Sequence, residues 1–421
     1  MLNNIQITNF KSILNDKISL GRINVFIGEN GSGKSNILEA LMFAKVAETY
    51  STVDADILYT NGIRVSKPSL LLSSFKGKKQ SDKVVIDLNF SNFSIHSELV
   101  PENKDNILSR WKSLVPISKD IENEINSYIE RLIKENDKNI TKLQIKEQNP
   151  EEKELLNFLN SEKYKELLFS KISEKIKTDI QGNNQIINTH KETEDYISLN
   201  DFVIYTLNTE ALRGIPEFQK SKKGIYGETL DIIISELTNE ERTELNEYLY
   251  TISWLQEFFI DERDELKQKG YKLNYSKSLL YFKDKYMSRQ NNVFSSENSN
   301  EGILHILFYL ANIISSKTPK LFAIDNIETS LNPHLCQHLM LELCKLSKKH
   351  NKQILITTHN PAILDGLNLF DDEIRLFEVK RTDNGDTKTR RIALKPEVKN
   401  SDYKLSDLWT RGFLGAISEN F

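Results

Sequence analysis

The chain has few cysteines and no excess of positive charge, and each shortage excludes a class of protein. Only two of its 421 residues are cysteines, Cys336 and Cys344, and both fall in one predicted helix. Two such thiols offer no disulfide framework and no cysteine metal site, and they suit a reducing cytosol. The formal net charge of −4 excludes a globally basic nucleic-acid coat, so any contact with DNA must come from a local patch.

Long apolar segments are also missing. The longest apolar stretch, 303–314, is about twelve residues long and includes His305 and Asn312, which makes it too short to span a bilayer. The first residues carry no basic segment that leads into an apolar core, so no secretion signal is visible. We therefore expect a cytoplasmic protein without membrane contact, long enough for two or three domains.

Residues 28–35, Gly-Glu-Asn-Gly-Ser-Gly-Lys-Ser, form a complete phosphate-binding loop (P-loop). The apolar run 23–27 before the loop predicts a buried strand, and apolar residues at helical spacing after it predict a helix. The glycines allow backbone N–H groups to converge on an anion, and the helix N-terminus adds partial positive charge. Lys34 can reach the β and γ phosphates, and the Ser35 hydroxyl can bind Mg²⁺. The loop predicts that the chain binds a nucleoside triphosphate.

Two further apolar runs end in polar residues. The run 321–324 ends in Asp325, and the run 354–358 ends in His359, with a predicted helix between them. Strands buried in parallel sheets have this composition, and ligands bind at the carboxyl ends of such strands. Asp325 is therefore predicted to hold Mg²⁺ together with Ser35. We expect His359 to sense the γ phosphate at the same sheet edge; a satisfied core histidine is the alternative.

Composition divides the chain into predicted segments. Residues 1–99 contain the P-loop and strand-like alternation, and residues 100–200 are dense in Lys, Glu, Asn and Ile with almost no Gly. Amphipathic helices are predicted near 121–132 and 168–180, so the second segment is a helical insertion with a solvated charged face. The remaining chain is predicted to form a strand plus helical subdomain at 201–290 and a second α/β lobe at 291–421.

The subdomain at 201–290 has its own local signals. They predict a strand at 202–205, a helix that starts at the capping box 238–241 and runs through Trp254 and Phe258, and strands at 271–275 and 279–282. The second lobe contains the buried runs described above and the turn Asp383-Asn384-Gly385, which predicts a hairpin.

These residues together resemble an ABC-type ATPase of the SMC/RecF/OLD group. The resemblance rests on Ile5-x-Ile7-x-Asn9-Phe10-Lys11-Ser12, the P-loop, Asp325 to Pro333, and Thr357-Thr358-His359-Asn360-Pro361. The ending from Leu405 to Gly415 also resembles stand-alone bacterial members, including anti-phage defence ATPases. The resemblance implies an α/β P-loop NTPase of the ABC/SMC-head type with a helical insertion. It also implies ATP and Mg²⁺ as cofactors and a homodimer or higher oligomer that sandwiches ATP.

The resemblance also assigns site residues. ATP would be bound by Lys11, Asn30, Gly31, Ser32, Gly33, Lys34 and Ser35. For Lys11, an exposed turn lysine is an equally good interpretation. The segment that reaches the γ phosphate of the partner subunit is best matched by Asn300, Glu301 and Gly302, immediately before the apolar helix. Asn300 replaces the usual serine, and an asparagine can still donate a hydrogen bond to a phosphate.

Position 326 departs from the family pattern. The family usually follows the strand aspartate with a glutamate that activates water, whereas this chain has Asn326 and places Glu328 two residues later. Asparagine cannot accept a proton from water at neutral pH, although it can orient one. Glu328 either turns toward the water or stabilises the loop, and both interpretations stay open. With Glu328, Asn326 and His359 as the candidate catalytic residues, we expect slow ATP hydrolysis.

The leading hypothesis is an ATP-dependent dimerisation switch that controls a partner effector, such as a nuclease, or DNA engagement in bacterial anti-phage defence. The alternative is a RecF-like DNA-repair clamp that binds DNA ends or gaps. Two basic segments could contact DNA phosphates, although exposed lysines are commonplace: Lys76, Lys78, Lys79 and Lys83, and Lys388, Arg390 and Arg391. His334 and His338 are four residues apart, but no HExxH pattern accompanies them, so they do not predict a metal site.

Overall fold

The computed structural model describes residues 1–50, 52–114, 193–216, 224–249, 252–273, 275–394 and 404–414. The predicted helices near 121–132 and 168–180, and with them most of the predicted insertion, lie outside the described residues. Nearly all described residues belong to the larger of two compact units, which is formed by Met1–Ser113 and Thr193–Phe421. Both halves of the sequence therefore build one unit.

A six-stranded sheet at the centre of this unit combines strands from both halves of the sequence, in the order β15-β14-β3-β13-β12-β8. Its strands are β3 (Ile23–Ile27), β8 (Val203–Tyr205), β12 (Leu321–Ile324), β13 (Gln353–Thr358), β14 (Ile374–Arg381) and β15 (Thr387–Ile392). All neighbours pair in parallel except β14 and β15, which form the predicted hairpin. The strands predicted at 23–27, 202–205, 321–324 and 354–358 are confirmed.

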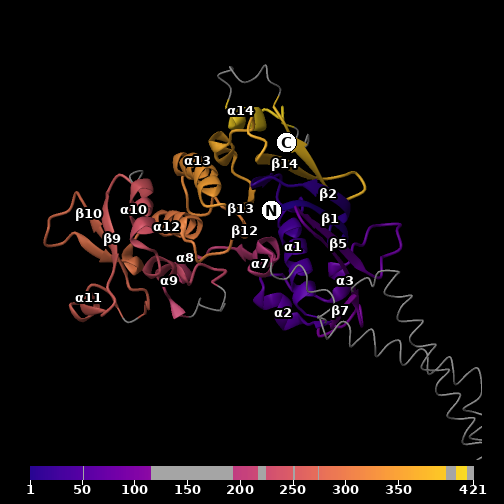
Figure 1. Ribbon diagram of the computed structural model, residues 1–421, viewed down its shortest axis with the longest axis horizontal. Helices are drawn as coiled ribbons and strands as arrows, with labels where there is room; N and C mark the ends of the chain where they lie inside the picture. The colour runs from indigo at the N-terminus through magenta and orange to yellow at the C-terminus, as the bar shows by residue number, and fades with distance from the viewer. Residues whose placement is uncertain are drawn as a thin grey trace, which may run out of the picture. The chain divides into compact units, whose positions relative to one another are not determined.

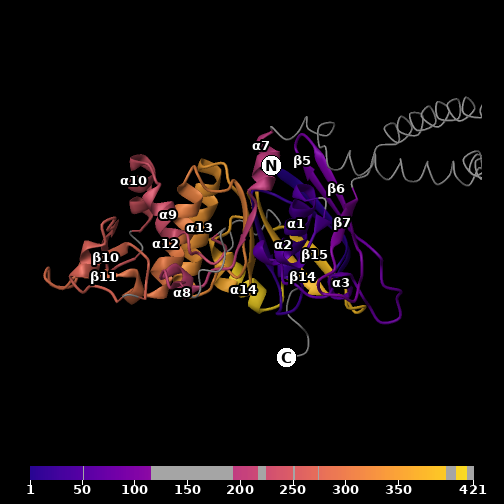
Figure 2. The same cartoon turned by 90° about the horizontal axis from the view of Figure 1, so that it is seen from below.

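Helices cover both faces of this sheet, and two separate cores result. Alternate residues of β3 serve different cores, because Val25 and Ile27 pack with the helices of the second lobe while Phe26 packs with α1 (Lys34–Thr49). On the Val25 face lie α12 (Glu301–Ile314), α13 (Pro333–Lys349), the 3₁₀ helix η6 (Pro361–Gly366) and α14 (Leu405–Thr410). Figures 1 and 2 show α12 and α13 on one side of the central strands and α1 on the other.

A second, antiparallel sheet covers the outer side of α1 and has the strand order β2-β1-β5-β6-β7-β4. It consists of β1 (Leu2–Phe10), β2 (Ile13–Ser19), β4 (Thr52–Val53), β5 (Val84–Phe90), β6 (Ser94–Pro101) and β7 (Trp111–Leu114), with the short helices α2 (Ala55–Thr60) and α3 (Pro68–Leu71). Buried residues alternate along β5, as its sequence predicts. Because α1 lies between two sheets, most of its residues are buried, including the charged Glu39 and Lys45.

The subdomain after residue 201 differs from the sequence prediction in two places. The capping box between Thr238 and Glu241 forms, but its helix α10 (Asn239–Tyr248) ends before Trp254, and Phe258 lies in β9 (Leu255–Ile260). The prediction of one long helix is wrong because β9 pairs with β10 (Leu280–Asp284), which lets Phe258 enter the core while Phe259 stacks on Tyr281.

The second difference concerns the predicted strand at 271–275. Its described residues form turns, whereas the neighbouring prediction at 279–282 is confirmed as β10. The Lys272 ammonium is buried against the Asp264 carboxylate and the Ser278 carbonyl, which holds the segment out of the sheet. The other elements here are α7 (Glu194–Asn200), α8 (Thr209–Leu212), α9 (Leu230–Ser235), α11 (Glu265–Gln268), β11 (Val293–Ser295) and η5 (Ser296–Asn298). No helix among the described residues is long and apolar enough to cross a bilayer.

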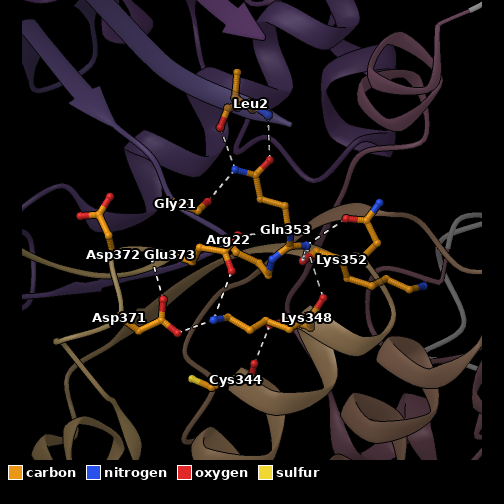
Figure 3. Close-up of polar contacts among 12 residues, drawn as sticks. Leu2, Gly21, Arg22, Cys344, Lys348, Lys352, Gln353, Asp371, Asp372 and Glu373 are labelled. Carbon is orange, nitrogen blue, oxygen red and sulfur yellow. Dashed lines mark hydrogen bonds and ion pairs between the residues drawn. The ribbon is translucent and has the colours of Figure 1, made fainter. Parts of the chain in front are cut away.

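One glutamine side chain joins the two sheets. Gln353, at the start of β13, is 5% exposed and donates from Nε2 to the carbonyl oxygens of Leu2 and Gly21, both at 2.7 Å. Its Oε1 accepts the Leu2 N–H at 2.9 Å. Figure 3 shows these bonds beside a network of ion pairs that includes Lys348 with Asp371. The amide thus pairs with β1 as a neighbouring strand would, and it satisfies three buried backbone groups.

We expect Gln353→Leu to lower the free energy of unfolding by about 3 kcal/mol, because three buried backbone groups lose their partner. Equilibrium unfolding in urea measures the change. The control is Gln256→Leu, since Gln256 is exposed on β9 and the same substitution there should change stability by less than about 0.5 kcal/mol. Equal stability of the two variants would contradict the bridging role.

Candidate functional site

The P-loop connects β3 to α1, and a side chain would not fit at two of its glycines, Gly28 and Gly33. Gly33 caps α1 with φ of 108°, and a Cβ atom there would lie 2.4 Å from Thr387 Oγ1. At Gly28 a Cβ atom would lie 2.1 Å from the carbonyl oxygen of Val379 on β14. The loop is therefore pressed against the C-terminal hairpin, and the first N–H groups of α1 are left to face an anion.

The C-terminal hairpin supports the loop through polar contacts that sequence reasoning missed. Thr387 Oγ1 donates to the Ser32 carbonyl at 2.7 Å, and Arg381 Nε donates to the Gly31 carbonyl at 3.2 Å. Since Thr387 has one hydroxyl proton, the Ser12 hydroxyl must donate to it at 2.7 Å, and the Asn36 amide in turn donates to Ser12 at 2.8 Å. No sequence signal identifies Thr387, because 355 positions separate it from Ser32.

The structure brings Lys34, Ser35 and Asp325 together. Lys34 is 7% exposed, and its ammonium donates to the carbonyl oxygens of Gly28 and Glu29 at 2.8 and 2.9 Å. Burial lowers the pKa of Lys34, while the nearby carboxylates of Glu328, Asp325 and Glu29 raise it. The Ser35 hydroxyl lies 3.0 Å from both carboxylate oxygens of Asp325. The Lys34 ammonium and the Asp325 carboxylate are thus both held at the N-terminus of α1.

Lys11 is held by acidic and aromatic neighbours. Its side chain is 14% exposed, its ammonium pairs with the Glu39 carboxylate of α1, and Arg64 donates to the same carboxylate at 2.6 Å. Burial is the main cause that lowers the pKa of Lys11, and Glu39 opposes it. The interpretation as an exposed turn lysine is wrong. A contact between Lys11 and a phosphate stays a prediction.

Asn326, Glu328 and His359 lie on adjoining loops at the carboxyl edge of the sheet. Asn326 has φ of 57°, a left-handed conformation that asparagine tolerates better than most residues. Glu328 Oε1 accepts the His359 N–H at 3.0 Å and lies 2.7 Å from His359 Nδ1. Glu328 Oε2 is buried and has no hydrogen-bond partner among the described residues. Because 55% of the His359 side chain is exposed, the alternative of a core histidine is wrong.

The segment Asn300 to Gly302 begins α12 and packs against the loop that follows Glu328. Asn300 Oδ1 caps the helix by accepting the Ile303 N–H at 3.0 Å. Glu301 Oε2 accepts the Ser330 hydroxyl at 2.8 Å, and a Cβ atom on Gly302 would lie 3.3 Å from the Ser330 carbonyl oxygen. Within the described ranges these three residues form no hydrogen bond to the P-loop of their own chain.

Residues of α8 and its C-cap Arg213, which sequence reasoning missed, contact this segment. Arg213 donates to the Ser299 carbonyl at 3.2 Å and pairs with Glu210 at 2.8 Å. His305 is fully buried beside the Thr209 hydroxyl, and burial lowers its pKa to about 4, so the imidazole is neutral at pH 7. Arg213 thus bonds to the residue before the cap of α12, and the buried His305 within α12 carries no charge.

Ser35 and Asp325 suit Mg²⁺ as a cofactor. Mg²⁺ prefers oxygen ligands and is usually bound through one or two carboxylates and substrate phosphates, so one hydroxyl and one carboxylate from the protein are sufficient. Among the described residues no group of three or more His, Cys, Asp or Glu side chains could hold a metal ion. The rings of His334 and His338 lie 6.4 Å apart on α13.

We expect Thr387→Val to weaken triphosphate binding about tenfold, because valine keeps the shape of the side chain but loses the bond to the Ser32 carbonyl. Titration with a fluorescent ATP analogue measures the affinity. Thr410→Val is the control, since Thr410 is exposed on α14 and its hydroxyl bonds only to its own helix. If both variants bind as tightly as the wild type, the support of the loop by Thr387 has no energetic weight.

Comparison with solved structures supports the same fold. The chain is similar to an SMC head bound to the C-winged helix domain of ScpA, with 13% identity, a TM-score of 0.51, and coverage of 94% of this chain and 99% of that one. An SMC head domain from Thermotoga maritima (11% identity, TM-score 0.44, 93% and 99% covered) matches less closely. A Pyrococcus furiosus SMC head with an extended coiled coil, bound to the C-terminal domain of ScpA, also matches less closely (14% identity, TM-score 0.46, 94% of this chain and 98% of that one covered). At these identities the likeness concerns the fold alone.

The predicted fold class, an α/β P-loop NTPase of the ABC/SMC-head type, is confirmed. No curated protein matches the sequence. A family model described as "AAA domain, putative AbiEii toxin, Type IV TA system" matches residues 23–365. This range begins at β3 and extends past His359, so it includes the P-loop, Asp325 and the strands that bring them together. Because the match spans most of the chain, the protein belongs to this AAA-domain family and is an ATPase of the SMC/ABC-like type.

Proposed function

We propose that the protein is an ATP-binding dimerisation switch that hydrolyses ATP slowly, with Glu328 in the role of the base that activates water. One observation carries this proposal. Glu328 Oε1 is occupied by two groups of His359, whereas Oε2 is buried, has no partner among the described residues and belongs to a carboxylate whose charge acts on Lys34. Burying a carboxylate oxygen without a hydrogen-bond partner costs free energy. A role in accepting a proton from the attacking water would explain why the chain keeps it.

Asn326 supports this division of roles. Its amide cannot accept a proton, and its left-handed backbone would cost a glutamate about 1 kcal/mol at the same position. Two residues later the chain has turned back, and Glu328 reaches His359. We infer that the Glu328 carboxylate replaces the carboxylate that is missing at position 326. The exposed His359 imidazole orients this carboxylate.

The remaining groups position and neutralise the phosphates. Lys34 would exchange its two carbonyl partners for phosphate oxygens, and the N–H groups at the start of α1 would bind the same anion. Ser35 and Asp325 would hold Mg²⁺, which when bound neutralises charge on the β and γ phosphates. Because a base displaced from position 326 to 328 contributes less than one at the usual position, while positioning and charge neutralisation contribute the rest, turnover by this site would be slow rather than absent.

A second copy of the chain would complete the site. Asn300 is exposed at the N-terminus of a fourteen-residue helix, and its Oδ1 is engaged in the cap, so its amide N–H₂ group faces outward. Such a terminus attracts an anion, yet in the described ranges it is not bonded to the P-loop of its own chain. The ATP of a partner subunit is the anion we propose, which makes the working form a homodimer around two ATP molecules.

We propose further that dimer closure signals to an effector, such as a nuclease, in bacterial anti-phage defence. The family description names a toxin of a toxin–antitoxin system, which supports a defensive role. The SMC head of similar fold was solved with a winged-helix domain of ScpA, which supports the idea that a head of this kind acts through a bound partner. The predicted insertion at 100–200 would carry the signal.

We expect Glu328→Gln to reduce ATP turnover by about 10²- to 10³-fold while ATP binding persists, because the amide cannot take a proton from water. Turnover and oligomeric state should be measured for the wild type, Glu328→Gln and Lys34→Ala, each with and without ATP. Glu328→Gln should accumulate as an ATP-bound dimer, and Lys34→Ala should neither bind ATP nor dimerise. A Glu328→Gln variant with wild-type turnover would exclude the substitute base, and a monomer in saturating ATP would exclude the completed site.

One observation favours the RecF-like DNA clamp as a second candidate. Two basic segments that are far apart in the sequence meet, since the Phe75 ring lies 3.7 Å from a Cβ built on Gly385 at the tip of the hairpin. Lys76, Lys78, Lys79, Lys380 and Arg381 are exposed there and form no ion pair within the described residues. Lys380 and Arg381 are additions to the basic residues that the sequence singled out. Of those, Lys83, Arg390 and Arg391 each pair with a carboxylate, and Lys388 donates to the Asn15 carbonyl.

If this surface binds DNA, we expect Lys78→Glu combined with Lys79→Glu to weaken DNA binding more than tenfold and to flatten its salt dependence, because fewer counterions are released. Filter binding between 50 and 200 mM salt tests this, with Lys269→Glu combined with Lys285→Glu as the charge-matched control on exposed residues elsewhere. Equal DNA binding by the two double variants would argue against a clamp at this surface.

A further inference from the structure

We propose that Thr357 is a positioning residue that orients Asp325 for Mg²⁺ and fixes the turn that carries Asn326 and Glu328. This inference rests on the proposed ATP site, because the metal it concerns is the one that ATP would bring. Thr357 lies one residue before the end of β13 and is completely buried. Thr357 begins the segment Thr357 to Pro361 that carries the family resemblance, but the sequence assigns it no role.

Thr357 forms three contacts with three consecutive residues. Its hydroxyl donates to Asp325 Oδ1 at 2.5 Å and accepts the Asn326 N–H at 2.9 Å, and its carbonyl oxygen accepts the Ile327 N–H at 3.2 Å. These bonds continue the pairing of β12 with β13 past Ile324, where the regular ladder stops. Beyond Ile324, the Thr357 side chain therefore bonds to the segment after β12, in place of the backbone groups that pair the two strands before it.

The chemistry of one hydroxyl fixes the direction of these bonds. The Asn326 N–H can only donate, so the single proton of the Thr357 hydroxyl must point to the Asp325 carboxylate. Asp325 Oδ1 therefore has a permanent donor, while Ser35, which lies 3.0 Å from both oxygens, is the only partner of Oδ2 among the described residues. The Ser35 hydroxyl would serve both Asp325 and Mg²⁺, whereas the Thr357 hydroxyl has no role toward the metal and would hold the carboxylate through Oδ1 alone, which leaves Oδ2 available.

The same bonds stabilise the turn that begins at Asn326. Asn326 has a left-handed backbone conformation, and its N–H is the group that donates to the Thr357 hydroxyl. Within this turn the Thr329 N–H donates to the Asn326 carbonyl and the Leu331 N–H donates to the Glu328 carbonyl. Thr357 therefore anchors both the metal ligand and, two residues further on, the proposed base.

Thr358 provides a matched control in the same strand. It is as deeply buried as Thr357, but its side chain points to the other face of the sheet, where the hydroxyl accepts the Asn360 N–H at 3.1 Å. Threonine and valine have nearly the same shape, so Thr357→Val and Thr358→Val each remove one buried hydroxyl and nothing else. Only the first removal affects Asp325.

The test compares ATP affinity with and without Mg²⁺, using a fluorescent ATP analogue and the full chain. The wild type should bind ATP more tightly with Mg²⁺. Thr357→Val should lose about 10- to 100-fold of this gain while binding metal-free ATP normally, as is typical when the partner of a metal ligand is removed. Thr357→Ser, which keeps the hydroxyl, and Thr358→Val should both stay within about threefold of the wild type. Electron paramagnetic resonance of Mn²⁺ bound with ATP gives a second readout, independent of turnover.

Several outcomes would overturn the proposal. It fails if Thr357→Val keeps the full Mg²⁺ gain, or if Thr358→Val loses as much as Thr357→Val. If Thr357→Val does not fold, Thr357→Cys replaces it; the weakly donating thiol must then lose the gain that Thr357→Ser keeps. A wild-type protein whose ATP affinity gains nothing from Mg²⁺ would overturn both this inference and the proposed function, whereas the failures named above leave the proposed function intact.

Discussion

The parallel pairing of β3 with β13 on one side and with β14 on the other is the constraint on which the rest of the structure depends. A strand from the first thirty residues is hydrogen-bonded between two strands that lie more than 300 positions later. Because parallel strands end at the same edge, this pairing places the P-loop beside Asp325 and His359 without any direct link in the sequence. The arrangement of the site therefore follows from the order of the strands.

Much of this order could be predicted from the sequence. The strands at 23–27, 321–324 and 354–358 are short, continuous apolar runs bounded by polar residues, and the P-loop supplies a strong local signal. The rule that ligands meet at the carboxyl ends of parallel strands was enough to group Lys34, Ser35, Asp325 and His359. Local patterns gave the wrong secondary structure where tertiary pairing determines it. The sequence around Phe258 is typical of a helix, but the segment pairs with β10 and forms a strand.

The supporting contacts could not be predicted, for a physical reason. Gln353, Thr387 and Thr357 act through single hydroxyl or amide groups, and common polar residues of this kind carry no periodic signal. Their partners are 31 to 375 positions away, so only the folded chain identifies them. The same is true of Glu328: its distance from Asn326 along the chain was evident, but its bond to His359 was not. Sequence reasoning finds the groups that meet a ligand more readily than the groups that hold them.

The contact between the C-terminal hairpin and the P-loop has a consequence for biosynthesis. A nascent chain that ends before Ile374 lacks β14, which lies along Gly28, and it lacks Thr387, which holds the Ser32 carbonyl. Domains generally begin to fold from the N-terminus during synthesis, so β3 and α1 emerge from the ribosome long before their loop has its support. The P-loop therefore gains the contacts that support it only when translation has passed β15.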